Sequence, residues 1–523
     1  MVEFAARTQR LSVMAELFNL SEALIDVHLA AGRGDRPALR YEGATHSYRD
    51  VSRLVACAGN ALRSLGVEME DRVALLLPDS PEFVATFLGA IRIGAVPVTL
   101  STYLTSDDYA ELLADCRARV LVAHASVMPR VAPIRSDLRH LRHVVIAGGE
   151  PGDDVAFDAL TRTQPDELTP EPTTADDMAF WQYSSGTTGR AKAVVHLHGP
   201  AVAPADLHGT HVVGMNADDR VLSIAKLFFS YGLGASLLIP FRHGASSILL
   251  PGRPEPRLVF ETIARERPTL LYAVPTAYAA LLAVPESHDL SMLRRCISAG
   301  ESLPAPLFER WRARFGLEIL DGIGSTEIGY IAISNFPGRA RPGTSGQVIP
   351  GYEARVQRTD GEPAAVGEIG DLLVRGPSTA AFYWRQRAAT KHTFRGEWVF
   401  TGDRYSVDAD GYYTNHGRSD DLLRVSGHWV SPLEVESVLL RHAAVRECAV
   451  VARADGDGLI KPCAYVVCAE GTAAAPALAD ELKAFVKDSL APYKYPRWVE
   501  FIPELPKTST GKIQRFKLRQ TAP

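Results

Sequence analysis

The chain has 523 residues, more than one hydrophobic core usually supports, so we expect two or three domains. Hydrophobic residues make up 46% and charged residues 22%, and the net charge of -5 argues against a surface dedicated to nucleic acid or anionic lipid. The N-terminal stretch is broken by charges, unlike a signal peptide, and no apolar run is long enough to span a membrane, so we expect a cytoplasmic protein. The scattered cysteines complete no zinc-site spacing, which predicts reduced thiols at Cys57, Cys116, Cys296, Cys448, Cys463 and Cys468.

The first half of the chain alternates short apolar runs with helical patterns. Val73–Leu77 predicts a strand, and Ser80 and Pro81 then have the residue types of an N-cap and a first helical position. More apolar runs lie near turn residues or helical stretches, at residues 119–124, 143–148, 246–251 and 269–274. This alternation predicts an α/β fold in which helices cover parallel sheets. The polar, Pro-rich stretch at 161–177 predicts a surface connection.

The pattern changes in the last third of the chain. Residues 343–416 contain short strand-like pieces between glycines, which predict a small barrel-like or mixed sheet. After Gly417–Asp421 a compact tail reads helix, strand, strand, helix. The predicted fold is therefore a large N-terminal α/β domain that includes the small barrel-like sheet, followed by a small α+β domain.

The nine residues "SSGTTGRAK" at 184–192 have the composition of a phosphate-binding loop, although the glycine spacing is not that of a Walker loop. Glycine lets backbone N–H groups approach phosphate, hydroxyls donate hydrogen bonds and lysine adds charge. An ordinary surface turn is the alternative. The candidate phosphate ligands are Ser184, Ser185, Gly186, Thr187, Thr188, Gly189 and Lys192.

Four further stretches follow in order: "DGIGSTE" at 321–327, "FTGD" at 400–403, "GRSDDLLRVSGHWVSPLEVE" at 417–436 and "PKTSTGKIQR" at 506–515. Together with the loop at 184–192 they resemble the acyl-adenylate-forming superfamily, which includes acyl-CoA synthetases, adenylation domains of peptide synthetases and luciferases. The resemblance covers nearly the whole chain. Residues 226–234, 321–327 and 341–353 are most similar to the benzoate–CoA ligase branch.

The resemblance implies a role for each motif in binding MgATP. Glu327 is the expected Mg²⁺ ligand, Thr326 donates to the α-phosphate, and Lys512 bridges the substrate carboxylate and the α-phosphate as the catalytic lysine. Asp403 accepts hydrogen bonds from the ribose hydroxyls, with Arg418 beside it. The expected adenine neighbours are Ser298, Ala299, Gly300, Glu301, Asp321, Gly322 and Ile323.

The resemblance also implies two domains that change their relative orientation. The boundaries are 1–419 for the ATP and acid site and 420–523 for a mobile domain, with the hinge at Asp420. The mobile domain brings Lys512 to the site for adenylation and then rotates. Gly427 then lines a tunnel for the pantetheine arm of coenzyme A, where a missing side chain leaves room for a slender ligand.

Two departures from the superfamily pattern concern the phosphate loop and the acid pocket. Ala191 and Ala193 replace the usual proline and glycine around Lys192, so we expect an altered loop exit and a slow ATP step. Gly329 lies where related enzymes tend to carry a bulky residue, so we expect room for an acid larger than benzoate. The alternative is that Gly329 is needed for positive φ and that Tyr330 or Phe229 fills the space. The expected acid pocket comprises Phe229, Ser230, Tyr231, Gly232, Gly324, Ile328, Gly329 and Tyr330, with Ser298 nearby.

The predicted function is an AMP-forming carboxylic acid–CoA ligase for an aromatic or bulky cyclic acid. It would use ATP, Mg²⁺ and coenzyme A, bind no nucleic acid or membrane, and form a homodimer. One alternative performs mainly the thioester half-reaction on an acyl-adenylate made elsewhere, and another adenylates an acid and loads it onto a carrier protein. An alternative from a different functional class is a non-catalytic nucleotide sensor. The presence of Lys512, Glu327 and Asp403 argues against this alternative.

Overall fold

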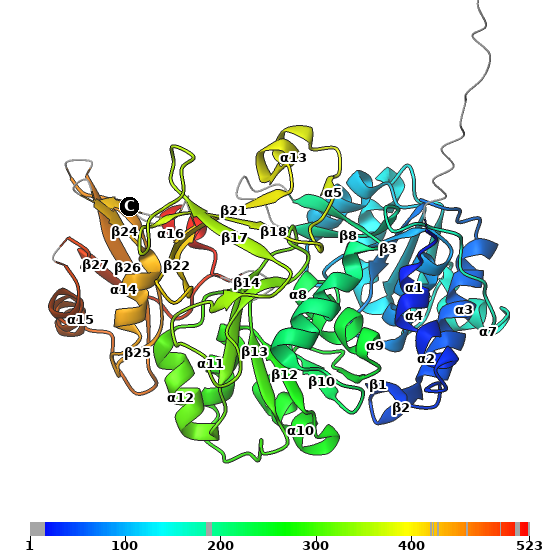
Figure 1. The fold of residues 1–523 in the computed structure, drawn as a ribbon, viewed down its shortest axis with the longest axis horizontal. Coiled ribbons are helices and arrows are strands. Elements are labelled where there is room, and N and C mark those ends of the chain that lie inside the picture. Colours follow the sequence, from blue (N-terminus) through cyan, green and yellow to red (C-terminus); the bar gives the residue numbers. More distant parts are fainter. Residues whose placement is uncertain are drawn as a thin grey trace, which may run out of the picture.

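The computed structural model describes residues 16–184, 191–418, 421, 423–425, 428–456, 459–491, 493–507 and 513–520. Figure 1 shows two sheets that occupy the N-terminal and middle parts of the chain, an antiparallel sheet between them and the C-terminal part, and the C-terminal part at one end. The predicted fold class is confirmed in this described part.

The first sheet contains β8, the strand that ends at Ser184, the first residue of the predicted phosphate loop. Its strand order is β19-β9-β8-β4-β3-β5-β6-β7, with parallel pairing from β8 to β7 and antiparallel pairing of β8 with β9 and of β9 with β19. Its inner strands are short and apolar on both faces because helices cover both sides. The bounds are β3 Arg72–Leu76, β4 Val96–Thr99, β5 Val120–His124, β6 His143–Ala147, β7 Val155–Ala156, β8 Met178–Ser184, β9 Lys192–Leu197 and β19 Phe382–Tyr383.

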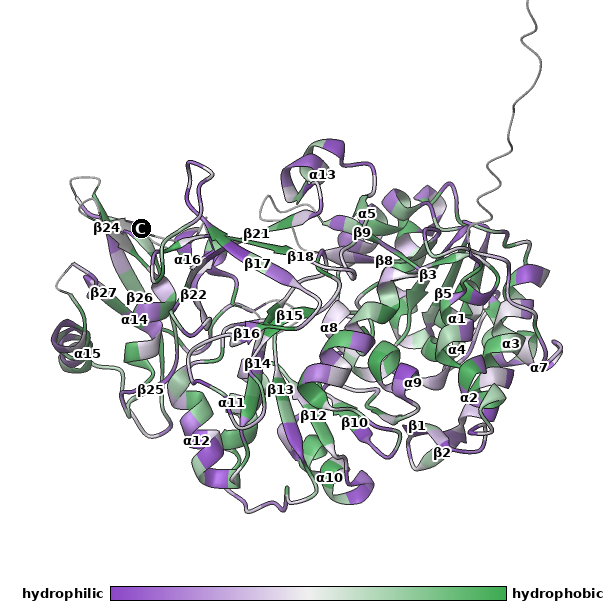
Figure 2. Cartoon of the chain, viewed as in Figure 1, coloured by the Kyte–Doolittle hydropathy of each residue, from purple (hydrophilic) through white to green (hydrophobic). Residues whose placement is uncertain are grey.

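The second sheet has the order β16-β15-β14-β13-β12-β10-β11-β1-β2, and its strands from β14 to β1 are parallel. Figure 2 shows hydrophobic residues along its central strands. The bounds are β1 Pro37–Tyr41, β2 Ala44–Ser47, β10 Arg220–Ser223, β11 Ser246–Leu249, β12 Leu270–Ala273, β13 Arg295–Ser298, β14 Ile319–Gly324, β15 Ile331–Ser334 and β16 Gln347–Val348.

Helices pack on these sheets through apolar faces. The α4 helix, Pro81–Arg92, is buried along nearly its whole length, and the Ser80 hydroxyl caps it by accepting from the Phe83 N–H. The other helices of this part are α1 Leu20–Leu24, α2 Asp26–Ala30, α3 Tyr48–Ser64, α5 Ser106–Cys116, α6 Met128–Val131, α7 Phe157–Arg162, α8 Ser230–Leu233, α9 Ile239–His243, α10 Pro256–Glu266, α11 Pro275–Ala283 and α12 Ala305–Phe315, with π-helical segments at Ala205–Val213 and Gly234–Leu238.

The antiparallel sheet and the C-terminal part complete the fold. The antiparallel sheet joins β17 Glu353–Gln357, β18 Gly370–Arg375, β20 Phe394–Arg395, β21 Trp398–Val407 and β22 Tyr413–Arg418, with α13 Arg387–Thr393 beside it. The C-terminal part pairs β23 Leu423–Val425 with β24 His428–Val430, and β25 Val445–Ala454 with β26 Ile460–Cys468 and β27 Trp498–Phe501. Its helices are α14 Pro432–Leu439, α15 Pro476–Ser489 and α16 Arg515–Gln520.

Most elements predicted from the sequence are present. The apolar runs form β3, β5, β6, β11 and β12, and the tail contains the expected helices α14 and α15 and strands β25 and β26. All six cysteines are free thiols, as predicted. Within the described residues, no helix combines the length and the apolar character needed to cross a bilayer.

Candidate active site

The candidate site lies where strands of the two large sheets end. Ser184 is the last residue of β8, and β14 ends at Gly324, after which a turn carries Thr326 and Glu327. The carboxyl ends of parallel strands are where α/β sheets bind ligands. The Ser184 hydroxyl donates to Glu327 Oε1 at 3.0 Å, so the two motifs that carry them meet in space.

A second hydroxyl fixes the same carboxylate. The Tyr383 hydroxyl donates to Glu327 Oε1 at 2.8 Å, and the Ala380 N–H donates to the Glu327 carbonyl at 2.9 Å. Lys192 Nζ lies 4.9 Å from the centroid of the Tyr383 ring. Tyr383 therefore links the predicted phosphate-loop lysine to the predicted metal ligand, and the motifs of the sequence gave no indication of it.

The carboxylate of Glu327 suits a hard cation that also binds a ligand. A carboxylate oxygen is the ligand type that Mg²⁺ prefers, and Mg²⁺ in nucleotide sites is usually held by one or two carboxylates plus phosphates. The described residues contain no group of three or more His, Cys, Asp or Glu side chains that could hold a metal alone. The arrangement fits a magnesium ion that Glu327 binds together with ATP.

The expected adenine neighbours surround a buried carboxyl group. Ser298, at the end of β13, donates its hydroxyl to Asp321 Oδ1 at 2.8 Å, and the Leu303 N–H donates to Oδ2 at 3.4 Å. Burial raises the pKa of Asp321 to about 8, and the nearby charge of Glu301 acts in the same direction. Asp321 is therefore mostly protonated at neutral pH. Around it, Ala299, Gly300 and Glu301 follow β13, and Gly322 and Ile323 lie in β14.

The expected ribose ligands lie together on the antiparallel sheet. Asp403 on β21 pairs in register with Arg418 on β22, and Arg418 Nη1 lies 3.4 Å from Asp403 Oδ1. Burial raises the pKa of the Tyr405 phenol, and the nearby charge of Asp403 acts in the same direction. Asp321, on the predicted adenine side, acts on Tyr405 in the same direction, so the predicted ribose and adenine groups both lie near this buried tyrosine.

The predicted acid-pocket residues gather around α8. The Ser230 hydroxyl donates to Gln182 Oε1 at 2.6 Å, and the Tyr231 hydroxyl donates to the Ile297 carbonyl at 3.0 Å. The Tyr330 ring lies 6.0 Å from the Tyr231 ring. Phe229 precedes α8 and Gly232 lies within it, while Gly324 ends β14 and Ile328, Gly329 and Tyr330 follow in the turn.

The space expected at Gly329 is not open. Gly329 has a φ of 89°, and a Cβ atom there would lie 2.3 Å from the Ser378 carbonyl oxygen. A side chain at this position is therefore excluded by backbone conformation and by the neighbouring chain. The alternative prediction, that Gly329 is needed for a positive φ, is therefore correct. The large side chain of Tyr330 is also buried.

The expected perturbation of the phosphate loop by Ala191 and Ala193 assumed that these positions need a positive φ, and the structure does not support that assumption. Neither residue has a positive φ. Ala193 is a fully buried residue of β9 that pairs with Tyr183, and its carbonyl accepts from the Trp384 N–H at 2.9 Å. Alanine suits this strand position, so glycine is not required at the loop exit.

Several predicted residues lie outside the described residues. They are the loop residues Ser185, Gly186, Thr187, Thr188 and Gly189, the hinge Asp420, the tunnel residue Gly427 and the catalytic Lys512. Their roles remain predictions. The described Arg515 binds Glu436 through both carboxylate oxygens, at 2.8 and 2.7 Å, and is close enough to Glu301 to feel its charge. The segment after Lys512 is thus near the predicted adenine side of the site.

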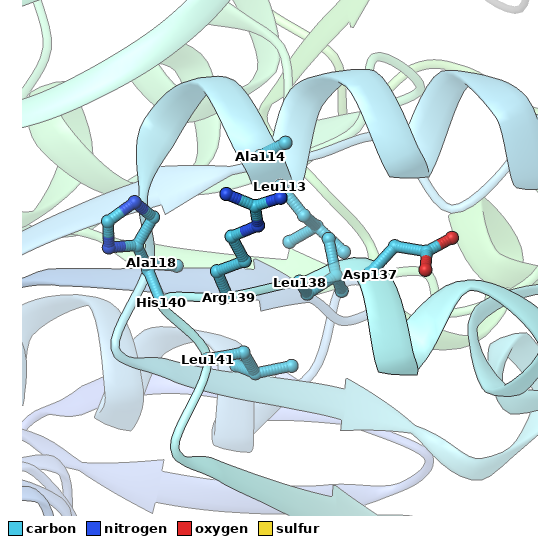
Figure 3. A pocket seen from close by; sticks show the side chains of 8 residues that line it. All are labelled: Leu113, Ala114, Ala118, Asp137, Leu138, Arg139, His140 and Leu141. Carbon is cyan, nitrogen blue, oxygen red and sulfur yellow. The ribbon is translucent and has the colours of Figure 1, made fainter.

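A separate pocket lies away from these residues. Figure 3 shows it beside α5, with a volume of about 190 Å³ and with Leu138, Arg139 and His140 among its lining residues. Two other lining residues, Ala118 and Leu141, precede β5 and β6, so the pocket is at the amino ends of those strands. The candidate site is at the opposite, carboxyl ends.

The fold and the grouping of these motifs define an acyl-adenylate-forming enzyme. Residues 27–384 match the family described as AMP-binding enzyme, and residues 434–512 match the AMP-binding enzyme C-terminal domain. The chain belongs to the AMP-binding enzyme family.

Relatives of known activity match almost the full length. The chain is 46% identical over 508 residues to a benzoate–CoA ligase of Thauera aromatica, with 96% of each chain covered. It is 46% identical over 507 residues to a 4-hydroxybenzoate–CoA/benzoate–CoA ligase of Rhodopseudomonas palustris, covering 96% of this chain and 94% of the relative.

Solved structures agree with these matches. The anthranilate CoA ligase AuaEII in complex with anthranoyl-AMP has a TM-score of 0.93 at 43% identity, with 97% of each chain covered. A benzoate CoA ligase from Burkholderia xenovorans LB400 has a TM-score of 0.90 at 40% identity, covering 96% of this chain and all of the other. The predicted benzoate–CoA ligase branch is confirmed.

Proposed function

We propose that the protein is an AMP-forming ligase that joins an aromatic carboxylic acid to coenzyme A through an acyl-adenylate. The observation that carries the proposal is the meeting of Ser184 and Glu327 at the carboxyl ends of β8 and β14, beside the acid pocket around Tyr231. The benzoate–CoA ligases that match along nearly the whole chain supply the substrate class.

The first half-reaction activates the acid. A carboxylate oxygen attacks the α-phosphorus of ATP, the bond from that phosphorus to the pyrophosphate oxygen breaks, and acyl-adenylate and pyrophosphate form. The reaction brings an anion to a polyanion, so preorganised positive charge and hydrogen-bond donors account for much of the catalysis. Lys192 and the hydroxyls from Ser184 to Thr188 are proposed to bind the β- and γ-phosphates. Magnesium held by Glu327 would neutralise phosphate charge, and Lys512 would stabilise charge at the α-phosphate.

The second half-reaction forms the thioester. The thiol sulfur of coenzyme A attacks the acyl carbon, its proton is released, and AMP leaves with the electron pair of the broken carbon–oxygen bond. We include in the proposal the domain boundary at 419/420, rotation about Asp420 and passage of the pantetheine arm near Gly427. These features rest on the resemblance of the sequence motifs.

A panel of acids tests the function directly. Benzoate, its ring-hydroxylated and ring-amino derivatives and aliphatic acids would each be incubated with MgATP and coenzyme A, and AMP and acyl-CoA would be quantified. We expect AMP and acyl-CoA in equal amounts with aromatic acids. Acyl transfer to a phosphopantetheine-bearing carrier protein, but not to coenzyme A, would favour the carrier-loading alternative. Thioester formation only from supplied acyl-adenylate would favour the half-reaction alternative.

The cell location and the assembly state belong to the same proposal. We propose a cytoplasmic location, because free thiols are typical of a protein in a reducing compartment, and we propose a homodimer as the assembly to be tested. Light scattering during size-exclusion chromatography would measure the number of chains.

A further inference from the structure

A lysine and an aspartate form a buried ion pair between the two large sheets. Lys226 Nζ lies 3.7 Å from Asp79 Oδ2, and the side chains of Lys226 and Asp79 are 4% and 2% exposed. Lys226 also donates from Nζ to the Leu250 carbonyl. Taking charged groups out of water is costly, and replacing a buried ion pair by apolar side chains of similar volume is often neutral or stabilising. A gain in stability alone therefore does not account for this pair.

The ion pair lies at the carboxyl ends of strands from both sheets. Asp79 follows β3 of the first sheet, and Lys226 and Leu250 follow β10 and β11 of the second sheet. The candidate site also lies at the carboxyl ends of strands, on β8 of the first sheet and β14 of the second. The pair thus connects the two sheets on the side where the substrates are proposed to bind.

Asp79 also holds the backbone of the segment that begins at Lys226. Asp79 Oδ1 accepts from the Leu227 N–H at 2.9 Å, so one carboxylate fixes the side chain of Lys226 and the backbone of the next residue. The Lys226 carbonyl accepts from the Phe229 N–H at 3.0 Å. A Cβ atom at Gly232 would overlap the Lys226 carbonyl, so α8 packs directly on this backbone.

The segment held by the ion pair carries the predicted acid pocket. Ser230 and Tyr231 follow Lys226 closely in the chain. The Ser230 hydroxyl donates to Gln182 Oε1 in the first sheet, and the Tyr231 hydroxyl donates to the Ile297 carbonyl in the second. The segment therefore spans the junction of the two sheets, and its position depends on how the sheets are joined there.

We propose that Asp79 and Lys226 are positioning residues for the acid, because their ion pair fixes the segment 226–232 between the two sheets. Both residues act through this segment, which places Phe229 and Tyr231 to contact the aromatic ring, and not by touching the acid. The inference rests on the proposed function, because it assigns the acid to the pocket around Tyr231. The groups proposed to bind ATP lie on other elements, so the pair should affect binding of the acid more than binding of ATP.

The test measures kcat, KM for the acid and KM for ATP in AMP formation, with the best acid of the panel described above. The main variant combines Asp79→Asn with Lys226→Met, which removes both charges and leaves no buried charge unpaired. Small misplacements of binding groups weaken binding and catalysis strongly, so we expect KM for the acid to rise about tenfold or more. KM for ATP should stay within about threefold of that of the unmodified enzyme.

Two further variants keep the test decisive. Asp79→Asn alone keeps an acceptor for the Leu227 N–H and should also raise KM for the acid, so a poorly folded double variant would not end the test. Asp219→Asn is the matched control, because Asp219 is a buried carboxylate that accepts from Arg294 Nε at 2.7 Å. That pair lies at the amino ends of β10 and β13, so its loss should lower the melting temperature and leave KM for the acid unchanged.

Some results would overturn the inference while leaving the proposed function intact. One is an unchanged KM for the acid in the double variant. Another is an equal rise in KM for the acid and for ATP, or a fall in kcat alone, which would indicate a general loss of structure. A third is an equal rise in KM for the acid in Asp219→Asn, which would mean that loosening the sheet anywhere has this effect. Absence of AMP formation by the unmodified enzyme with every acid would instead refute the proposed function, and the inference with it.

Discussion

The substitution Tyr383→Phe removes one of two hydroxyls that donate to the same oxygen of Glu327. Tyr383 donates at 2.8 Å and Ser184 at 3.0 Å. Hydrogen bonds to charged groups contribute about 1.5–3 kcal/mol, which corresponds to about 10–150-fold in rate or affinity. Because Ser184 remains as a donor, we expect the lower end of this range, about a tenfold fall in kcat/KM for adenylation. A weaker hold on Glu327 should also raise the Mg²⁺ concentration needed for half-maximal rate.

The assay separates the two half-reactions. Acid-dependent exchange between ATP and labelled pyrophosphate, measured over a range of Mg²⁺ concentrations, reports adenylation. Conversion of synthetic acyl-adenylate to acyl-CoA reports the second step, which needs neither pyrophosphate nor its metal, and this rate should stay within about twofold of that of the unmodified enzyme.

A matched control for Tyr383→Phe is the substitution of another buried tyrosine that lies away from Glu327. Tyr413→Phe also removes a buried tyrosine hydroxyl, which donates to the Ala354 carbonyl at 3.2 Å, and should leave both half-reactions unchanged. Unaltered exchange and Mg²⁺ dependence in Tyr383→Phe would refute the argument that this contact positions the metal ligand. An equal loss in both half-reactions would indicate general damage to the fold.

Other substitutions test the remaining assignments. Lys512→Ala should lower adenylation by orders of magnitude and spare thioester formation from supplied adenylate, and equal losses would contradict domain alternation. Asp420→Pro should abolish one half-reaction and keep the other, whereas normal turnover would place the hinge elsewhere. Ala193→Gly should not speed pyrophosphate exchange, because Ala193 is an ordinary strand residue, and faster exchange would contradict this. Gly329→Ala should lower the melting temperature and the activity with all acids, while a changed acid preference would reopen the enlarged-pocket idea. Folding raises the pKa of Asp321 to about 8, so the folded state keeps a proton that the unfolded state releases above pH about 4. Its contribution to stability therefore falls as the pH rises from about 4 through 8, and Asp321→Asn should make urea-unfolding free energies less dependent on pH in this window.

Features that depend on local sequence could be predicted well. Ser80 and Pro81 mark the start of α4 because a hydroxyl N-cap and a proline at the first position act within one helical turn. The apolar run at Val73–Leu77 forms β3 because helices cover both faces of a parallel sheet. The resemblance of the ordered motifs to the acyl-adenylate-forming superfamily was enough to predict that Ser184 and Glu327 lie in one site.

Features that depend on contacts between distant segments could not be predicted. Tyr383 reaches Glu327 only because β19 pairs with β9, whose residues are far away in the sequence. His208 lies in a π-helical segment, and nothing in the neighbouring sequence indicates that both ring nitrogens would be buried without partners among the described residues. The Ser378 carbonyl that excludes a side chain at Gly329 comes from yet another part of the chain.

The most direct test of the central claim is the stoichiometry of one reaction. Purified protein, ATP, Mg²⁺, coenzyme A and a benzoate-class acid would be combined, and nucleotides and thioesters would be quantified by chromatography. We predict one AMP, one pyrophosphate and one aroyl-CoA for each ATP consumed, with AMP formation dependent on the acid. Release of ADP, or no acid-dependent consumption of ATP with any aromatic acid, would contradict the assignment.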